Sequence, residues 1–397
     1  MRGFVLTEIR AKQIRLCFLG ILLGASIWAG RHGGGGDFFV LRKSVMAAWS
    51  GHFDGVYIRE SSGPFFYPPF ALVFFGFFNL FSSEPIAIVI NVFFHVLSFV
   101  GFCWGIRKLF PYLFSSTSFI FWFLSFCFSI APIHLDFMGQ NINLPLAAML
   151  VWVEVLRQRN SKINDFLCGF YSSLIAWIKI FPGFITLTYA LRGSRELRWG
   201  GIAGGIGGLI FPILVFRDGG FELYREFLRT IVIYHDKNLI DGSAVLNLPG
   251  LIARWGLGRV NQSLLNGLIF AIPLVIALAF WAWVFFKASK EENSENLTIW
   301  ATALGLMTFL NSASRPDYFV FYTPIFVSLL GSWRRLVSME RTLLLLAFAF
   351  IALTQQAMVG RYWNIELQFL RVPVIGMGFL FLVQAFLFYR SRKTWIE

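Results

Sequence analysis

The chain has 397 residues, of which 57% are hydrophobic and only 14% are charged, whereas about a quarter of the residues in an ordinary soluble domain are charged. A soluble globule of this size needs more polar surface than this composition supplies, so we expect an integral membrane protein. The net charge of +13 is spread over short basic clusters between apolar runs, as the positive-inside rule expects. There is no soluble basic module that could bind nucleic acid.

Apolar runs that are long enough, or nearly long enough, to cross a bilayer recur along the whole chain. The candidates are 14–30, 86–105, 113–133, 141–156, 164–190, 199–216, 264–286, 297–311, 317–331, 341–358 and 367–389. The first follows four basic residues and lacks a clean cleavage site, so we expect a retained helix. The pattern predicts an all-α polytopic membrane protein with about 10–12 transmembrane helices, in which 1–397 is a single membrane domain.

Basic clusters between the runs orient the chain. They are Arg107-Lys108, Arg157 to Lys162, Arg192 to Arg198, Lys287 to Lys290, Arg334-Arg335 and Arg390 to Lys393. If all of them face the cytoplasm, the opposite side receives 31–66, 134–143, 217–262, 311–317 and 359–366. Those segments hold nearly every unusual polar residue, so we expect the chemistry on the non-cytoplasmic face.

Two of these outer loops are predicted to contain amphipathic helices lying on the membrane surface. One is Phe38 to Ser50, with Arg42 and Lys43 on its polar side, and the other lies in 217–262. The number of crossings requires that one of the two runs 66–81 and 86–105 does not cross, and we expect the run after Pro68-Pro69 to dip in and return or to lie along the interface. If Arg192 to Arg198 is cytoplasmic, Lys179 lies near an outer turn between two short helices, which we favour; if 164–190 is one long helix, Lys179 lies deep within it.

Asp37 is the first candidate for catalysis because it follows four glycines, which let the chain bend a carboxylate towards a ligand. A base that deprotonates a sugar hydroxyl must be ionised and within about 3 Å of that proton. A solvated loop residue is the alternative. Asp54, in Gly51-His52-Phe53-Asp54-Gly55, is interpreted as part of an ordinary turn.

Further polar groups stand at the ends of apolar runs. Tyr67-Pro68-Pro69 is rigid, although it could simply begin a helix. Gln140, Asn141 and Asn143 offer neutral donors and acceptors, and helix capping explains one of them. Lys179 lies among apolar residues, where a charge costs roughly several kcal/mol and usually has a partner or a ligand; snorkelling to the interface is the alternative.

Late in the chain, Asn311-Ser312-Ala313-Ser314-Arg315-Pro316-Asp317-Tyr318 concentrates polar groups. Arg315 could hold a phosphate in a forked geometry, or it could pair with Asp317. Four other residues are interpreted as solvated loop residues: His134, Asp136, His235 and Arg254. The four cysteines lack metal-type spacing, and no acidic pair suits magnesium, so no metal and no cofactor is expected.

The ordered set of Asp37, Tyr67-Pro68-Pro69, Gly139-Gln140-x-Asn, Lys179-x-x-Pro182 and a Ser-containing turn before Tyr318 resembles the polyprenol-phosphate-mannose-dependent mannosyltransferases, glycosyltransferase family 87. The resemblance extends from about residue 31 to residue 325 and implies the GT-C membrane fold.

The resemblance also implies an activity. The family transfers a sugar, here a hexose such as mannose, from a polyprenyl-phosphate donor to a lipid or glycan acceptor, at the bacterial inner membrane. Asp37 would be the general base, Lys179 and Arg315 would bind the donor phosphate, and Tyr67, Gln140, Asn143 and Tyr318 would bind the sugar or the acceptor. Family members usually carry a histidine in the late turn, where this chain has Ser314-Arg315-Pro316-Asp317-Tyr318; Arg315 or Tyr318 would take over part of its role.

Two other classes of protein remain open at this stage. A transporter or lipid flippase would line a path through the bilayer with its polar groups and often shows internal repeats, of which this sequence has none that is convincing. A structural or assembly protein would not need a charged residue inside an aromatic span. The position of Asp37, Lys179 and Arg315 relative to one another decides between the enzyme and the transporter.

Overall fold

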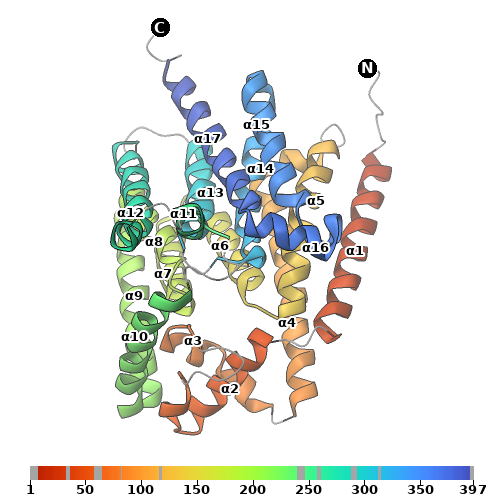
Figure 1. The fold of residues 1–397 in the computed structure, drawn as a ribbon. Helices are drawn as coiled ribbons and strands as arrows, with labels where there is room; N and C mark the ends of the chain where they lie inside the picture. Colours follow the sequence, from red (N-terminus) through yellow and green to blue (C-terminus); the bar gives the residue numbers. More distant parts are fainter. Residues whose placement is uncertain are drawn as a thin grey trace.

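The computed structural model is helical, and the residues it describes include no strand. Those residues are 8–32, 36–57, 65–81, 83–115, 119–238, 246–256, 261–287, 293–311 and 314–393. The helices stand side by side in a bundle, and α1 begins at the end of the bundle where α17 ends (Figure 1). The predicted all-α fold is confirmed.

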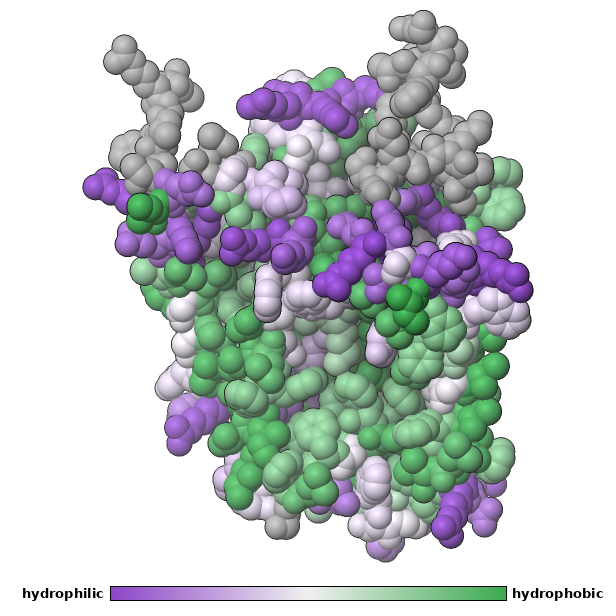
Figure 2. Space-filling model, turned by 180° about the vertical axis from the view of Figure 1, so that it is seen from behind, coloured by the Kyte–Doolittle hydropathy of each residue, from purple (hydrophilic) through white to green (hydrophobic). Residues whose placement is uncertain are grey.

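Six helices within the described ranges are long and apolar enough to cross a bilayer. They are α1 (Glu8–His32), α4 (Glu84–Leu109), α5 (Phe119–Gly139), α9 (Arg195–Phe216), α12 (Gln262–Lys287) and α17 (Val372–Lys393). Figure 2 shows hydrophobic side chains over the middle of the molecule, with hydrophilic ones gathered in a band above and at the lower edge. The chain is therefore a multi-pass membrane protein.

Shorter helices complete the bundle. They are α6 (Asn143–Arg157), α7 (Lys162–Ile178), α8 (Gly183–Arg192), α13 (Asn293–Phe309), α14 (Thr323–Gly331), α15 (Ser338–Phe348) and α16 (Gln356–Phe369). At about 1.5 Å per residue, none of them alone reaches across a hydrocarbon core of about 30 Å. Six of the predicted spans are thus long helices; 141–156 and 297–311 correspond to single shorter helices, α6 and α13, and the others are built from shorter pieces.

Breaks within the predicted spans come at prolines and at a local change of helix type. The run 164–190 is divided into α7 and α8 by a turn at residues 179–182, as predicted for Lys179. The run 317–331 is a 3₁₀ segment, η5 (Pro316–Tyr322), followed by α14. A π-helical segment, η7 (Ala349–Leu353), follows α15. Proline cannot donate to a preceding carbonyl, which is why Pro182 marks the first of these breaks, and Pro316 begins η5 just before the run 317–331.

The predicted span 113–133 is displaced in the structure. A 3₁₀ turn, η3 (Pro111–Phe114), precedes α5, which runs from Phe119 to Gly139. Residues 134–139 were expected in an outer segment and are instead helical. The reason is that Ile133 and Phe137 are both buried, so the apolar face of the helix continues past His134.

The two loops that we expected on the outer face contain helices, as predicted. They are α2 (Gly36–Trp49) and the 3₁₀ turn η1 (Phe53–Gly55) in the first loop, and α10 (Asp218–Asn238) and α11 (Leu248–Gly256) in the second. The run 66–81 forms only α3 (Pro69–Phe74) and the 3₁₀ segment η2 (Gly76–Leu80). Neither piece is long enough to cross a membrane. Both α2 and α3 lie at the end of the bundle opposite the start of α1 (Figure 1).

One prediction about α2 is wrong. Lys43 is exposed, but Arg42 is buried and donates from Nη2 to the carbonyl oxygen of Phe81 at 3.0 Å. Phe38, Leu41 and Val45 of α2 are packed into the core. Arg42 directly follows Leu41, and its side chain therefore reaches the end of η2. A carbonyl there needs a donor, which Arg42 supplies.

The position of Lys179 depends on close packing of α7 against α9. A side chain at Gly169, Gly200 or Gly204 would collide with the backbone of the facing helix, so small residues allow the two helices to touch. Two side chains of α7 then donate to α9 carbonyls: Ser173 Oγ to Gly201 at 2.8 Å and Trp177 Nε1 to Gly205 at 2.9 Å. These contacts fix α7 up to the residue before the turn.

Candidate active site

Four segments that are far apart in the sequence meet in one polar cluster. They are the first turn of α2, the connection between α5 and α6, the turn between α7 and α8, and the start of η5. The charged members are Asp37, Lys179, Arg315 and Asp317, with Asn141 and Asn143 between them. Two carboxylates and two cations therefore share one site of balanced formal charge.

Asp37 lies in the first turn of α2, where a helix N-terminus favours a negative charge. Its Oδ2 accepts hydrogen bonds from Arg315 Nη2 at 2.5 Å and from Asn141 Nδ2 at 2.8 Å. About a third of the Asp37 side chain (35%) remains exposed, as does 42% of Arg315. The ion pair is thus held in place and can still be reached from outside.

Asp317 is the inner carboxylate of the cluster, with 11% of its side chain exposed. Its Oδ2 accepts from Asn141 Nδ2 at 2.7 Å and from Asn143 Nδ2 at 2.8 Å, and it lies 3.5 Å from Arg315 Nη2. Asn141 therefore donates from one nitrogen to both carboxylates. This neutral bridge separates two like charges and fixes the distance between α2 and η5.

Lys179 caps the end of α7, as the prediction of a turn required. Its Nζ donates to Asn143 Oδ1 at 2.8 Å and lies 4.2 Å from the centre of the Tyr318 ring and 5.5 Å from that of Tyr67. A cation over aromatic faces is stabilised by the ring quadrupoles. The ammonium is therefore enclosed by rings on one side and connected through Asn143 to Asp317.

The connection between α5 and α6 owes its shape to a turn at the end of α5. Gln140 has a φ of 50°; its N–H bonds to the Phe137 carbonyl and that of Asn141 to the Asp136 carbonyl. This pair of bonds forms a Schellman motif, which closes a helix with one residue in the left-handed region. The reversal sends Gln140 and Asn141 in different directions. Asn141 reaches the carboxylates, whereas Gln140 Nε2 donates to the Gly30 carbonyl at 2.5 Å and its Oε1 accepts from Asn91.

Asp136 and His95 support this connection from behind and are both completely or almost completely buried. The Asp136 carboxylate accepts from the backbone N–H groups of Asn143 and Leu144 at 3.2 and 3.0 Å, which satisfies the first turn of α6. His95 Nε2 lies 2.5 Å from the Asn141 carbonyl and 3.5 Å from Asp136. The interpretation of Asp136 as a solvated loop residue is wrong, because α5 extends past it.

The remaining weak candidates differ in outcome. His134 is half-buried in α5 and so is not in a loop, and Arg254 is half-buried in α11 with its guanidinium over the ring of Phe369. The side chain of His235 lies outside the described residues, as do residues 33–35 and 312–313. Within the described ranges, no group of three or more His, Cys, Asp or Glu side chains could hold a metal ion.

Six of the seven residues proposed for the site come together: Asp37, Tyr67, Asn143, Lys179, Arg315 and Tyr318. Gln140 does not reach the cluster. Asn141 and Asp317 do, and the sequence already placed them in the motifs, but it did not identify which amide of Gln140-Asn141-Ile142-Asn143 faces the carboxylates. His95 lies within an apolar run that carries no other signal.

Comparison with known families indicates what kind of reaction the protein carries out. The sequence model of the family described as glycosyltransferase family 87 matches residues 65–313. The chain belongs to glycosyltransferase family 87. The matched region includes Tyr67, the 140–143 connection and Lys179, whereas Asp37 and Arg315 lie outside it. No curated protein and no solved structure matches the chain.

The protein is therefore a membrane glycosyltransferase, an enzyme that uses a sugar donor and an acceptor. Direct transfer of a sugar to a hydroxyl group is assisted by a base that takes the hydroxyl proton and by groups that stabilise the leaving group. The cluster of this glycosyltransferase contains groups of both kinds, in contact with one another.

Proposed function

We propose that the glycosyltransferase moves a hexose, and specifically mannose, from a polyprenyl-phosphate donor to a lipid or glycan acceptor, with Asp37 as general base. The observation that carries the proposal is the cluster in which an accessible carboxylate touches a cation that can bind phosphate. The acceptor oxygen attacks the anomeric carbon from the face opposite the phosphate, so the configuration of that carbon is inverted.

Asp37 is the better base of the two carboxylates because it is the more accessible. Its side chain is 35% exposed, against 11% for Asp317. Asp317 accepts from two amides, so a large acceptor has little room to reach it. We assign Asp37 to proton transfer and Asp317 to holding Asn141, Asn143 and Arg315.

Lys179 and Arg315 are assigned to the donor phosphate, whose negative charge grows as the sugar leaves. Arg315 now pairs with Asp37. When a phosphate binds, the guanidinium can share its forked donors with the phosphate oxygens, and the carboxylate is then free to accept the acceptor proton. Donor binding would in this way prepare the base, which links the two halves of the reaction.

Aromatic rings and amides around Lys179 are assigned to the sugar. Tyr318, Tyr67 and Phe181 all lie within 5.5 Å of the ammonium, measured to the ring centres, and offer flat apolar faces to a hexose ring. Asn143 supplies polar contacts beside them. Gln140, also assigned to the sugar from the sequence, is used by Gly30 and Asn91, so the geometry favours a positioning role for it.

A groove of about 400 Å³ between α12, α13 and α17 could take the lipid chain of the donor. Its walls are mostly aromatic and aliphatic, including Phe280, Leu306 and Phe381. Phe280 stacks on Phe184, at a ring-centre distance of 5.6 Å, and Phe184 lies in the first turn of α8, five residues after Lys179. An apolar surface therefore leads away from the proposed phosphate position.

The proposed location is the bacterial inner membrane, with the cluster on the non-cytoplasmic side. The basic ends of α4, α6, α8 and α17 belong to the cytoplasmic face by the positive-inside rule. Asp37 comes after the C-terminal end of α1, at the end of the bundle opposite the C-terminal end of α17 (Figure 1). A transporter is less well supported, because Asp37, Lys179 and Arg315 meet in one cluster with Asp317 and do not follow a path through the bundle.

The test uses purified protein, a synthetic polyprenyl-phosphate mannose with a labelled sugar, and membrane-lipid and glycan extracts as acceptors. Asp37→Asn is expected to lower release of lipid phosphate about 10²–10⁴-fold, the usual contribution of a general base. Asp54→Asn, which changes an exposed aspartate of the same loop, is the matched control and should keep full activity. Retention of activity in Asp37→Asn would contradict the assignment, and activity with another sugar alone would correct the donor.

A further inference from the structure

A second cavity lies far from the cluster, at the opposite end of α8. It is formed where α6 and α8 end and α9 and α13 begin, and its volume is about 60 Å³. The lining residues that matter here are Arg157, Thr188, Tyr189, Arg192, Asn296 and Trp300. Lys179 precedes α8 and Arg192 ends it, so at about 1.5 Å per residue the two sites are separated by roughly 15 Å of helix.

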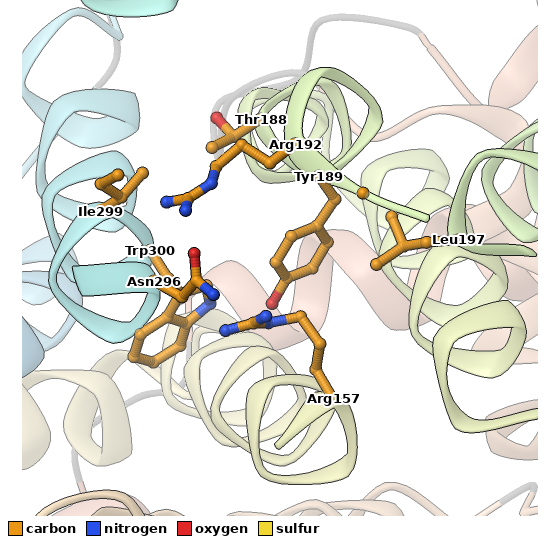
Figure 3. Close-up of a pocket in the computed structure, with 9 residues that line it drawn as sticks. Arg157, Thr188, Tyr189, Arg192, Leu197, Asn296, Ile299 and Trp300 are labelled. Carbon is orange, nitrogen blue, oxygen red and sulfur yellow. The ribbon is translucent and has the colours of Figure 1, made fainter. Parts of the chain in front are cut away.

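Arg157 is held rigidly at one wall of this cavity. Its Nε and Nη2 donate to the two oxygens of Glu154, at 2.8 and 2.6 Å, and Tyr189 donates its hydroxyl to the same carboxylate at 2.8 Å. Glu154 is completely buried. The negative charge of the Glu154 carboxylate is thus stabilised by three hydrogen bonds. They fix the Arg157 guanidinium so that the edge not bonded to Glu154 faces the cavity (Figure 3).

Trp300 supplies a donor that is not used within the described part of the chain. The residue is 1% exposed, and its indole Nε1 has no hydrogen-bond partner among the described residues. Leaving a buried donor unsatisfied is unfavourable, so such a group usually meets a ligand or water. Figure 3 shows its indole nitrogen on the side that faces Asn296 and Arg157.

Groups facing the cavity are mainly donors. The hydroxyl protons of Thr188 and Tyr189 are already used, by the Phe184 carbonyl and by Glu154. Arg192 and Asn296 extend into the space from α8 and α13, opposite Arg157 (Figure 3). Two guanidinium groups and an indole N–H around a small space select an anion. A cavity holds a water molecule once its volume reaches about 10–15 Å³, so about 60 Å³ leaves room for a small anion such as a phosphate group.

We propose that this cavity binds a phosphate group through Arg157, Arg192 and the indole N–H of Trp300. The phosphate can belong to an anionic lipid headgroup or be free inorganic phosphate, because both present the same oxygens. The site is independent of sugar transfer. When occupied, it ties α6, α8 and α13 together at the end of the bundle away from Asp37.

Binding is measured on the purified full-length protein in two arms. In the first, native mass spectrometry counts the phosphatidylglycerol molecules kept by protein released from phosphatidylglycerol vesicles. In the second, delipidated protein in detergent is titrated with inorganic phosphate, and the midpoint of thermal unfolding is followed. Trp300→Phe removes the N–H and keeps a large aromatic ring, and Arg192→Gln removes one charge. Arg335→Gln, an exposed arginine away from the cavity, is the matched control.

Each cavity variant should weaken binding about tenfold or more, because each removes a hydrogen bond to a charged group, which is stronger than one between neutral groups. The control should bind like the wild type. This pattern in the lipid arm alone identifies a lipid headgroup, and the same pattern with inorganic phosphate identifies the free ion; either supports the site. The proposal is overturned if the wild type binds neither probe, or if the cavity variants bind as well as the wild type in both arms.

Discussion

The two charged clusters of this glycosyltransferase differ in how their carboxylates are used. Glu154 is completely buried and accepts three hydrogen bonds from Arg157 and Tyr189. Asp37 is 35% exposed and shares Arg315 with Asp317. A carboxylate whose contacts are complete mainly stabilises the fold. An accessible carboxylate that shares its arginine with a second carboxylate, as Asp37 does, can give up that arginine when a substrate binds.

The largest expected difference concerns stability. Glu154→Ala leaves Arg157 and the Tyr189 hydroxyl without their partner in a buried site, and removal of one member of a buried ion pair costs about 3–5 kcal/mol. Asp37→Ala should change stability by less than about 1 kcal/mol, as expected for a partly exposed pair. Thermal unfolding in detergent measures both. Equal losses of stability in the two variants would show that Glu154 and Asp37 contribute to the fold to the same extent.

A smaller effect is expected at Arg315. Arg315→Lys keeps the charge but removes the forked geometry, and the lost bidentate contact is expected to raise the KM for the lipid-phosphate donor about tenfold. Steady-state kinetics with varied donor separates KM from kcat. Arg31→Lys, which changes an exposed arginine in the last turn of α1, serves as the control and should have wild-type kinetics. A fall in kcat at unchanged KM would instead assign Arg315 to the transition state alone.

Gln140 gives the smallest and most discriminating effect. If it positions the α5–α6 connection, Gln140→Ala should lower stability by about 1–2 kcal/mol through its lost bonds to Gly30 and Asn91. The preference among donor sugars should then stay unchanged. A panel of polyprenyl-phosphate sugars measures that preference. A changed preference at wild-type stability would restore the sugar-binding role inferred from the sequence.

Much of the candidate site could be predicted from the sequence because its residues differ chemically from their neighbours. Lys179 and Arg315 are charges in apolar surroundings, and Asp37 follows a glycine run. What could not be predicted is the direction of neighbouring side chains. Gln140 and Asn141 are adjacent amides in the same motif, and only the left-handed φ of 50° at Gln140 decides that Asn141 faces the carboxylates.

The fold divides in a similar way. Composition and hydropathy determined an all-helical membrane protein, because apolar runs in a bilayer must satisfy their own backbone groups. The break at Lys179–Pro182 could also be predicted, because proline cannot continue the hydrogen-bond ladder. The end of α5 could not, because it depends on the burial of Ile133 and Phe137 against other helices.

By itself, the sequence determined the class of the protein and most of the charged residues of its site. Only the tertiary structure decided that His95 and Asp136 support the connection to α6 and that Asn141 bridges Asp37 and Asp317. The physical reason is that these hydrogen bonds join residues from different helices. Local sequence fixes where a polar group stands on its helix, and the packing of helices decides which partner it meets.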